Sequence, residues 1–275
     1  MKEVYFDTNI YSHLLNHQHG VTEKDVTRLF ENIRADKVRV YLSDGILEET
    51  MGALMNQERE AIRRLRFIYR VVNRKRYLRP AVVIIRETIL AYAKGQRVPS
   101  YFTSPGPLNR MLKKQNEVDL LGLQLLAWAT QDRITDYVKV REAYYKTLRP
   151  EAKREMELKK RPTLQQYWNN DSKDIVEQFV DLYGVLKECR ERGIEGLLNF
   201  LPMKALSAGV ISNWYMNTYD RTKMNRGDIM DMDHVVYGAV VGTLVTHDSR
   251  FSTCLKRLPV DGFEIIDLHT LLNRV

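Results

Sequence analysis

Near its N-terminus the chain reads Val4-Tyr5-Phe6-Asp7-Thr8-Asn9-Ile10, a β-branched and aromatic run that leads into a carboxylate. A second apolar run with the same ending lies toward the C-terminus, at Gly242-Thr243-Leu244-Val245-Thr246-His247-Asp248. Buried strands of parallel sheets have this character, and ligands of open α/β sheets collect at the carboxyl ends of such strands. We therefore predict that Asp7 and Asp248 lie side by side, although they are far apart in the sequence.

The sequence after the first run alternates between helix and strand patterns. Thr22 is placed to cap a helix that begins at Glu23, and residues 38–43 form another β-branched run. Ser43 and Asp44 are placed to cap the helix that follows. This β-α-β-α order predicts an α/β fold with a doubly wound parallel sheet flanked by helices.

The middle of the chain has a different character. Residues 56–221 are rich in Glu, Lys, Arg, Leu and Tyr at helical spacing, and the α/β pattern resumes after them with a last strand at 262–267. We therefore predict a discontinuous core formed by residues 1–55 and 222–275. The segment 56–221 is predicted to be a large, mostly helical insertion.

The composition argues against a membrane-spanning, a secreted and a disulfide-rich protein. No apolar run approaches the roughly 20 residues that cross a bilayer, and no secretory signal is evident. The chain has two cysteines, Cys189 and Cys254, which give no disulfide framework or cysteine-rich zinc site. We expect a cytoplasmic protein that does not contact a membrane.

One segment concentrates the positive charge of the chain, whose net charge is +8. Residues 59–79 are rich in arginine and contain Glu60 as their only acidic residue. Apolar residues recur there at helical spacing, which predicts one amphipathic helix. Its arginine face is either a phosphate-contacting surface or a merely solvated one. The candidate nucleic-acid-binding residues are Arg59, Arg63, Arg66, Arg70 and Arg74.

Four segments, in this order, are similar to those of the PIN-domain family. They are Asp7-Thr8-Asn9 after the first strand, an acidic helix after the second strand, an Asp-led helix, and Val245-Thr246-His247-Asp248. Members of this family are metal-dependent nucleases, mainly ribonucleases, and include toxins of bacterial toxin–antitoxin pairs. The resemblance covers the two predicted core segments and implies a PIN-like fold, an RNA substrate and a Mg²⁺ or Mn²⁺ cofactor. The long helical middle departs from the small toxin members.

The resemblance also implies where the acidic residues of the site lie. Asp7 matches the first acid of the family pattern, and Asp248 matches the acid of the segment that follows the late strand. The second acid is either Glu48 or Glu49. Counting six residues from Ser43 favours Glu49.

The third acid is Asp228, Asp231 or Asp233. Asp231 is preferred because it leads the segment Asp231-Met232-Asp233-His234 and lies at about the usual spacing before Asp248. The expected catalytic and metal-binding set is therefore Asp7, Glu49, Asp231 and Asp248, with Asp228 and Asp233 as further metal-ligand candidates.

Carboxylates suit this chemistry because Mg²⁺ and Mn²⁺ prefer oxygen ligands and are commonly shared with substrate phosphates. One or two such ions could activate a water and neutralise charge on the leaving oxygen. Thr8, Asn9 and Thr246 are predicted to hold the carboxylates in place as outer donors. Neither His234 nor His247 is needed, and a structural hydrogen bond is expected for each.

Other interpretations of these residues exist. Asp7 and Asp248, taken singly, could be helix N-caps. His13, His17 and His19 could suggest zinc, because the first two are four residues apart. We interpret these histidines instead as part of a polar surface helix.

The leading hypothesis is a metal-dependent endoribonuclease, acting as a toxin, a defence factor or an RNA-processing enzyme. One alternative is a structure-selective DNA nuclease, because the same carboxylates would serve on DNA. Another is a catalytically inactive PIN-like module that binds nucleic acid. The resemblance also allows an antitoxin or other protein partner and a homo-oligomer.

Overall fold

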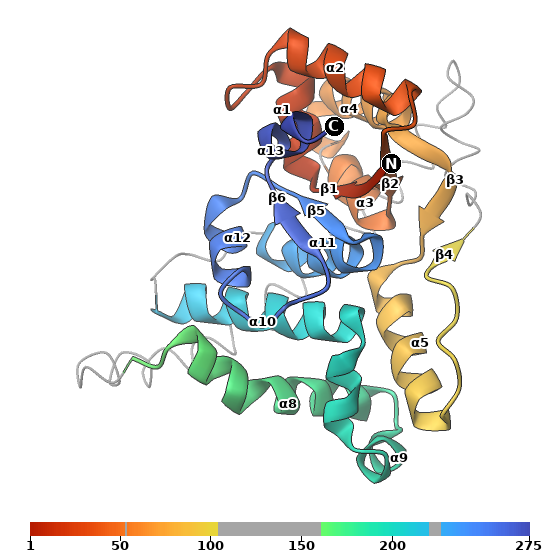
Figure 1. The fold of residues 1–275 in the computed structure, drawn as a ribbon, viewed down its shortest axis with the longest axis vertical. Coiled ribbons are helices and arrows are strands. Elements are labelled where there is room, and N and C mark those ends of the chain that lie inside the picture. The colour runs from red at the N-terminus through yellow and green to blue at the C-terminus, as the bar shows by residue number, and fades with distance from the viewer. Residues whose placement is uncertain (53, 104–160, 220–226) are drawn as a thin grey trace.

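The described residues form an α/β fold around a six-stranded, mostly parallel sheet. The computed structural model describes residues 1–52, 54–103, 161–219 and 227–275 (Figure 1). The strand order is β4-β3-β2-β1-β5-β6. The strands are β1 (Lys2–Phe6), β2 (Val38–Leu42), β3 (Val72–Leu78), β4 (Phe102–Thr103), β5 (Thr243–Val245) and β6 (Glu264–Ile266).

The first strand lies between β2 and β5 and pairs in parallel with both. Phe6 is in register with Val245, and the Asp7 backbone N–H donates to the Val245 carbonyl at 3.0 Å. Val4, Tyr5 and Phe6 are fully buried, so successive side chains of β1 are covered on both faces of the sheet. The two strands therefore end side by side at one edge of the sheet.

Helices flank the sheet on its two faces (Figure 1). Helix α11 packs against β1 and β5, and α10 packs against α11 and α8. The α2 helix begins with the expected capping box between Thr22 and Asp25. The helices are α1 (Thr8–Asn16), α2 (Glu23–Arg34), α3 (Asp44–Gly52), α4 (Leu54–Val71), α5 (Ala81–Lys94), α8 (Leu164–Leu182), α9 (Leu186–Glu191), the 3-10 helix η1 (Ile194–Asn199), α10 (Leu201–Tyr219), α11 (Gly227–Val241), α12 (Ser249–Leu255) and α13 (Leu268–Asn273).

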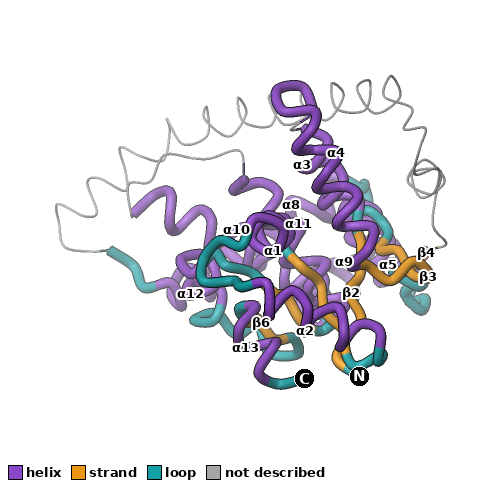
Figure 2. The backbone as a smooth tube through the Cα atoms, turned by 90° about the horizontal axis from the view of Figure 1, so that it is seen from above, coloured by secondary structure: helices purple, strands orange, loops and turns teal. Residues whose placement is uncertain are grey.

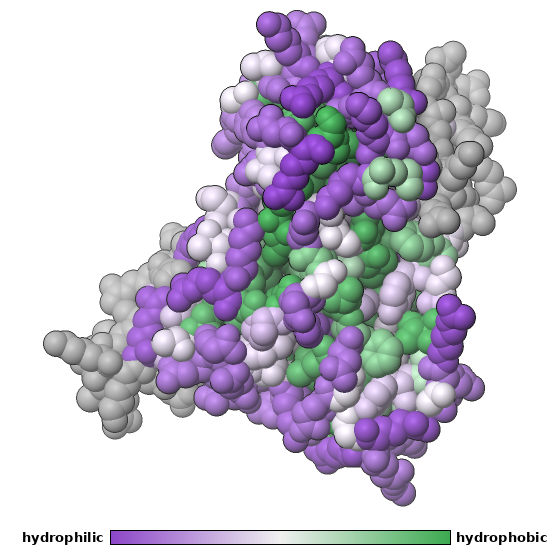
Figure 3. Space-filling model, in the orientation of Figure 1, coloured by the Kyte–Doolittle hydropathy of each residue, from purple (hydrophilic) through white to green (hydrophobic). Residues whose placement is uncertain are grey.

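Two further views show the arrangement of the helices and the character of one face of the molecule. Helices α3 and α4 extend together away from the strands (Figure 2). On the face seen in the orientation of Figure 1, hydrophilic side chains cover the end of the molecule near α2, and apolar side chains show across its middle (Figure 3). Among the described helices, none has the length and apolar character needed to cross a membrane.

The segment 59–79 is not one helix, which corrects the sequence prediction. Helix α4 ends at Val71, and β3 begins at Val72 and pairs in parallel with β2. Val72, Tyr77 and Leu78 are buried there, so pairing and burial at the sheet override the helical spacing. The β4 strand pairs antiparallel with β3 at its outer side. The segment 56–221 therefore supplies two strands of the sheet, and its residues 104–160 lie outside the described residues.

Gly238 marks a close approach of α11 to β5. A Cβ at this position would lie 2.6 Å from Leu244 Cβ and 3.2 Å from Leu244 Cα. Gly209, in α10, would place its Cβ 3.5 Å from Met232 Cα, which is an ordinary contact. The first glycine is therefore needed for packing, and the second is not.

We expect Gly238→Ala to lower the free energy of unfolding by about 1–3 kcal/mol, because the added methyl group overpacks the helix–sheet contact. Gly209→Ala is the matched control and should leave it unchanged or raise it by up to about 1 kcal/mol through helix propensity. Urea unfolding of the two variants measures both. A neutral Gly238→Ala would contradict the close approach.

Candidate metal centre

Asp7 lies at the carboxyl end of β1 and caps α1. The residue is buried, with 5% of its surface exposed. The Thr246 hydroxyl donates to Asp7 Oδ2 at 2.8 Å, and the Asn9 backbone N–H approaches Oδ1 at 3.5 Å. Thr246 follows β5, so the residue after the second strand fixes the carboxylate that follows the first. Asp7 is thus both a helix cap and a buried acid directed toward the strand ends.

Glu49 and His234 reach the same place from α3 and α11. His234 Nε2 lies 3.1 Å from Glu49 Oε1 and 3.6 Å from Asp7 Oδ1. One potential ligand atom from each of Asp7, Glu49 and His234 lies within 4.8 Å of the others. Three elements that are distant in sequence therefore offer a compact set of metal-ligating atoms.

A buried hydrogen-bond chain holds His234 in this position. His234 Nδ1 lies 2.8 Å from the Tyr5 hydroxyl, and the Tyr5 hydroxyl lies 2.7 Å from Ser43 Oγ. Ser43 Oγ also accepts from the Ile46 backbone N–H at 3.4 Å, in the first turn of α3. The chain links β1, α3 and α11, so the ring orientation is set by the sheet itself. The expected structural hydrogen bond of His234 is confirmed.

His234 carries a proton at neutral pH. Burial alone would lower the pKa of this imidazole, but attraction to Glu49, the hydrogen bond to Glu49 and attraction to Asp7 together raise it to about 9. Both ring nitrogens then donate, Nδ1 to Tyr5 and Nε2 to Glu49. The imidazolium therefore supplies positive charge among the carboxylates.

Asp231 and Asp248 complete the acidic group. Burial raises the pKa of Asp231 well above its ordinary value, and repulsion from Asp7, Asp248 and Glu49 raises it further. Asp248 caps α12 by accepting from the Phe251 backbone N–H at 2.8 Å. Its own backbone N–H donates to Thr246 Oγ1 at 3.0 Å. The four expected acids are thus close enough to affect one another's ionisation.

The structure separates the sequence alternatives geometrically. Glu49 Oε1 lies 3.1 Å from His234 Nε2 and belongs to the compact ligand group with Asp7. Glu48 and Asp233 act on Tyr237, whose pKa they raise. Glu49 raises the pKa of Asp7. The Asp228 side chain lies outside the described residues. The acids that the structure brings together are Asp7, Glu49, Asp231 and Asp248, and their catalytic role stays a prediction.

Of the three residues expected to hold the carboxylates as outer donors, two contact Asp7 and one contacts His234. Thr246 holds Asp7 through its hydroxyl, whereas Asn9 does so through its backbone N–H. The Thr8 hydroxyl lies 3.4 Å from His234 Nε2 instead. Sequence reasoning did not place His234 at the centre of the group. The three-residue spacing of Asp231 and His234, which puts both on one helix face, was the available signal.

His13 is buried, which corrects its interpretation as part of a polar surface helix. Its side chain is 8% exposed, whereas His17 and His19 are exposed. The ring packs on those of His19 and His247, with centroids 4.1 and 4.8 Å away. Burial, with repulsion from His19 and His247, lowers the pKa of His13 to about 4. The ring is therefore uncharged at neutral pH.

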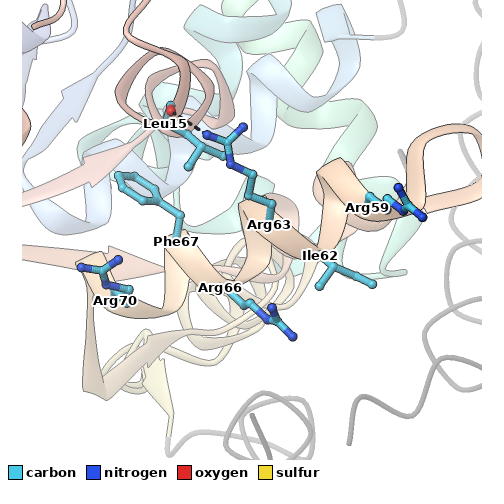
Figure 4. Close-up of a pocket in the computed structure, with 7 residues that line it drawn as sticks. All are labelled: Leu15, Arg59, Ile62, Arg63, Arg66, Phe67 and Arg70. Carbon is cyan, nitrogen blue, oxygen red and sulfur yellow. Dashed lines mark hydrogen bonds between the residues drawn. The ribbon is translucent and has the colours of Figure 1, made fainter. Parts of the chain in front are cut away.

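The arginines of α4 form a stripe beside the end of α1. Arg59, Arg63, Arg66 and Arg70 are exposed and are spaced by four, three and four residues, which places them on one face of a helix. They line a hollow of about 430 Å³ together with Leu15, Ile62 and Phe67 (Figure 4).

Two of these arginines also make contacts within the protein. Arg63 donates to the Leu15 carbonyl at 3.4 Å and to Asn16 Oδ1 at 3.3 Å, and Arg70 lies over the Phe30 ring. The Arg74 side chain lies outside the described residues.

The raised pKa of His234 predicts a pH dependence of the metal-free protein. Its proton contributes stability that is fully present below the ordinary value of 6.5 and is lost as the pH rises through about 9. In EDTA, the wild type should lose up to roughly 3 kcal/mol over this range relative to His234→Gln. Denaturant unfolding at several pH values measures the difference. His17→Gln, at an exposed position, should keep the wild-type slope, and equal slopes for all three proteins would contradict the assignment.

Comparison of the chain with protein-family models, with curated proteins and with solved structures finds no match in any of the three.

Proposed function

We propose that the protein is a metal-dependent nuclease with a PIN-like arrangement of its site, and that its substrate is RNA. The observation that carries this proposal is the meeting of four acids from separate segments at the carboxyl ends of neighbouring parallel strands. Single strand-end acids are explained by helix capping, as Asp7 and Asp248 both show. Capping does not explain Glu49 and Asp231, which lie within α3 and α11: Glu49 belongs to the compact ligand group, and the pKa of Asp231 is raised by Asp7, Asp248 and Glu49.

The donor set fits Mg²⁺ or Mn²⁺. Carboxylate oxygens are the ligands that these hard cations prefer, and Asp7 and Glu49 offer them within the compact group. The raised pKa of Asp231 supports the fit, because a nearby cation would stabilise the charged form of an acid that is repelled by its neighbours. When bound, such an ion would supply a water of lowered pKa and neutralise negative charge on a phosphate.

Separate residues of the chain would hold the ion and orient its ligands. Asp7 and Glu49 would hold the ion, and Thr246 would keep Asp7 oriented through its hydroxyl. Asp231 and Asp248 would add negative charge beside the ion and so strengthen its binding. His234 holds a proton on Nε2 against Glu49 at 3.1 Å, so the occupancy of the site by a cation and the protonation of His234 oppose each other.

The arginine stripe supports a nucleic-acid substrate. Helix α4 packs against both α1 and α3. Asp7 caps α1, and Glu49 lies within α3. The exposed guanidinium groups of α4 can contact successive phosphates, and the half-buried Leu15 and Ile62, which line the same hollow, can contact a base or sugar. Nothing in these contacts depends on a 2′-hydroxyl, so single-stranded DNA belongs in the same test.

A second candidate function is nucleic-acid binding without cleavage. The observation that favours it is the His234 imidazolium, which already compensates the charge of Glu49 and Asp7. A site balanced in this way could persist as a scaffold without an ion. Cleavage assays distinguish the two functions.

We expect the protein to cut RNA with Mn²⁺ or Mg²⁺ and not with EDTA, and Asp7→Asn to abolish cutting without unfolding the protein. The reason is that Asn keeps the cap and the shape of Asp7 but removes its charge. End-labelled tRNA, single-stranded RNA and single-stranded DNA are the substrates. Mn²⁺ should also raise the melting temperature of the wild type more than that of the variant.

The matched control for this experiment is Asp36→Asn. Asp36 has a left-handed backbone conformation that Asn tolerates, and it pairs with Arg39 away from the site. It should cut at the wild-type rate. Full activity of Asp7→Asn would falsify the nuclease proposal, and binding without cutting in the wild type would favour the scaffold.

The double variant Arg59→Gln/Arg66→Gln should weaken RNA binding and reduce its salt dependence. Each lost phosphate contact lowers the slope of log affinity against log salt by about 0.7 for a single strand, so the two together lower it by roughly 1.4. Fluorescence anisotropy at several salt concentrations measures this slope. Arg28→Gln/Arg257→Gln removes the same charge at exposed positions outside the stripe. Equal slopes for the two double variants would show that the stripe is merely solvated.

A further inference from the structure

Four of the six histidines of the chain lie together beside the carboxyl end of β5. They come from α1, from the loop after α1, from the connection between β5 and α12, and from α13. The ring centroids of His13 and His19 are 4.1 Å apart, those of His13 and His247 4.8 Å, and those of His19 and His247 5.8 Å. The His269 centroid lies 6.4 Å from that of His247. We call these four residues the histidine cluster.

The rings are spaced closely enough for their imidazoles to be brought around one ion by rotation of the side chains. Three imidazoles bound to a tetrahedral zinc at about 2.0–2.1 Å have ring centroids roughly 5 Å apart. The three distances among His13, His19 and His247 lie on both sides of this value.

Two nitrogens of the histidine cluster are buried without a hydrogen-bond partner among the described residues. They are His13 Nδ1 and His247 Nε2. A buried polar atom left unpaired costs about 1–3 kcal/mol, and each such atom in a folded protein calls for a physical reason. His13 is also more than nine-tenths buried and uncharged at neutral pH, which is the form in which imidazole binds a metal.

The loop after α1 is shaped to bring His19 onto this site. His17 and His19 have φ values of 52° and 54°, in the left-handed region that residues other than glycine rarely adopt. Gly20 follows with φ 78°, and a Cβ there would lie 3.5 Å from His269 Nε2. The loop therefore turns back over His13 and faces a nitrogen of the fourth histidine.

We propose that His13, His19 and His247 form a second metal site, with His269 beside it, that binds a borderline divalent cation such as Zn²⁺. Imidazole nitrogens suit this class of ion, whereas the carboxylates of the first site suit Mg²⁺ and Mn²⁺. Among the described residues, only the Asp7, Glu49 and His234 group has its ligand atoms already within 4.8 Å of one another. Binding at the histidine cluster therefore involves rotation of rings about their Cβ–Cγ bonds, and exposed His19 has room for it.

The bound ion would tie the loop after α1 to the segment that carries Asp248. His247 directly precedes Asp248, and His13 and His19 lie on α1 and its following loop. The site would thus fasten the two ends of the chain together next to the acidic group. This inference does not depend on nuclease activity.

The test compares two substitutions on one loop by calorimetric titration with Zn²⁺. His19→Asn and His17→Asn both replace an exposed histidine in a left-handed conformation with a residue that tolerates it, but only His19 belongs to the histidine cluster. The wild type and His17→Asn should bind one Zn²⁺ equally. His19→Asn should bind it at least about tenfold more weakly, because even loss of an outer-shell partner costs 10–100-fold.

Glu49→Gln separates this site from the first one and should leave Zn²⁺ affinity unchanged. His269→Ala serves as a second variant and should weaken binding less than His19→Asn. Equal affinity of His19→Asn and His17→Asn, absence of binding by the wild type, or loss of Zn²⁺ binding in Glu49→Gln each overturns the proposal. A failed cleavage assay leaves the titration interpretable, because no RNA is involved.

Discussion

The position of β1 between two parallel neighbours is the constraint on which the rest of the site depends. Because Phe6 is in register with Val245, the residues that follow the two strands meet at one edge of the sheet, and the Thr246 hydroxyl reaches Asp7 at 2.8 Å. The close approach of α11 at Gly238 then brings Asp231 and His234 over the same edge. A shift of one residue in this register would turn Tyr5 to the other face and remove the anchor of His234.

Gathering acids at this edge has an electrostatic cost, and the fold contains its own compensation. Two carboxylates about 4 Å apart repel by roughly 4 kcal/mol at an effective dielectric constant near 20. The His234 imidazolium offsets part of this repulsion, and its raised pKa is the measure of that attraction. Tyr5 and Ser43 hold the ring where it can do so. The proton of the His234 imidazolium thus supplies part of the positive charge that a divalent ion would bring.

Local sequence patterns predicted the local features of the fold. They did not predict the features that depend on tertiary contacts. The strands that became β1, β2 and β5 were predictable from apolar runs ending in polar residues, and the Thr22 cap was predictable from its spacing to Asp25. The β3 strand was not, because its arginine-rich sequence gains its strand conformation from pairing with β2 and β4. The burial of His13 depends likewise on His19 and His247, of which the latter comes from the far end of the chain.

The segment Thr246-His247-Asp248 connects the two groups of potential ligands. Its threonine orients Asp7, its aspartate joins the acidic group, and its histidine packs in the histidine cluster. Oxygen and imidazole ligands select different classes of cation, so the two groups need not compete for one ion. A movement of this segment would nevertheless displace ligands on both sides at once, because Thr246 is bonded both to Asp7 and to the Asp248 backbone. The acidic group therefore keeps its geometry only while this segment holds its conformation.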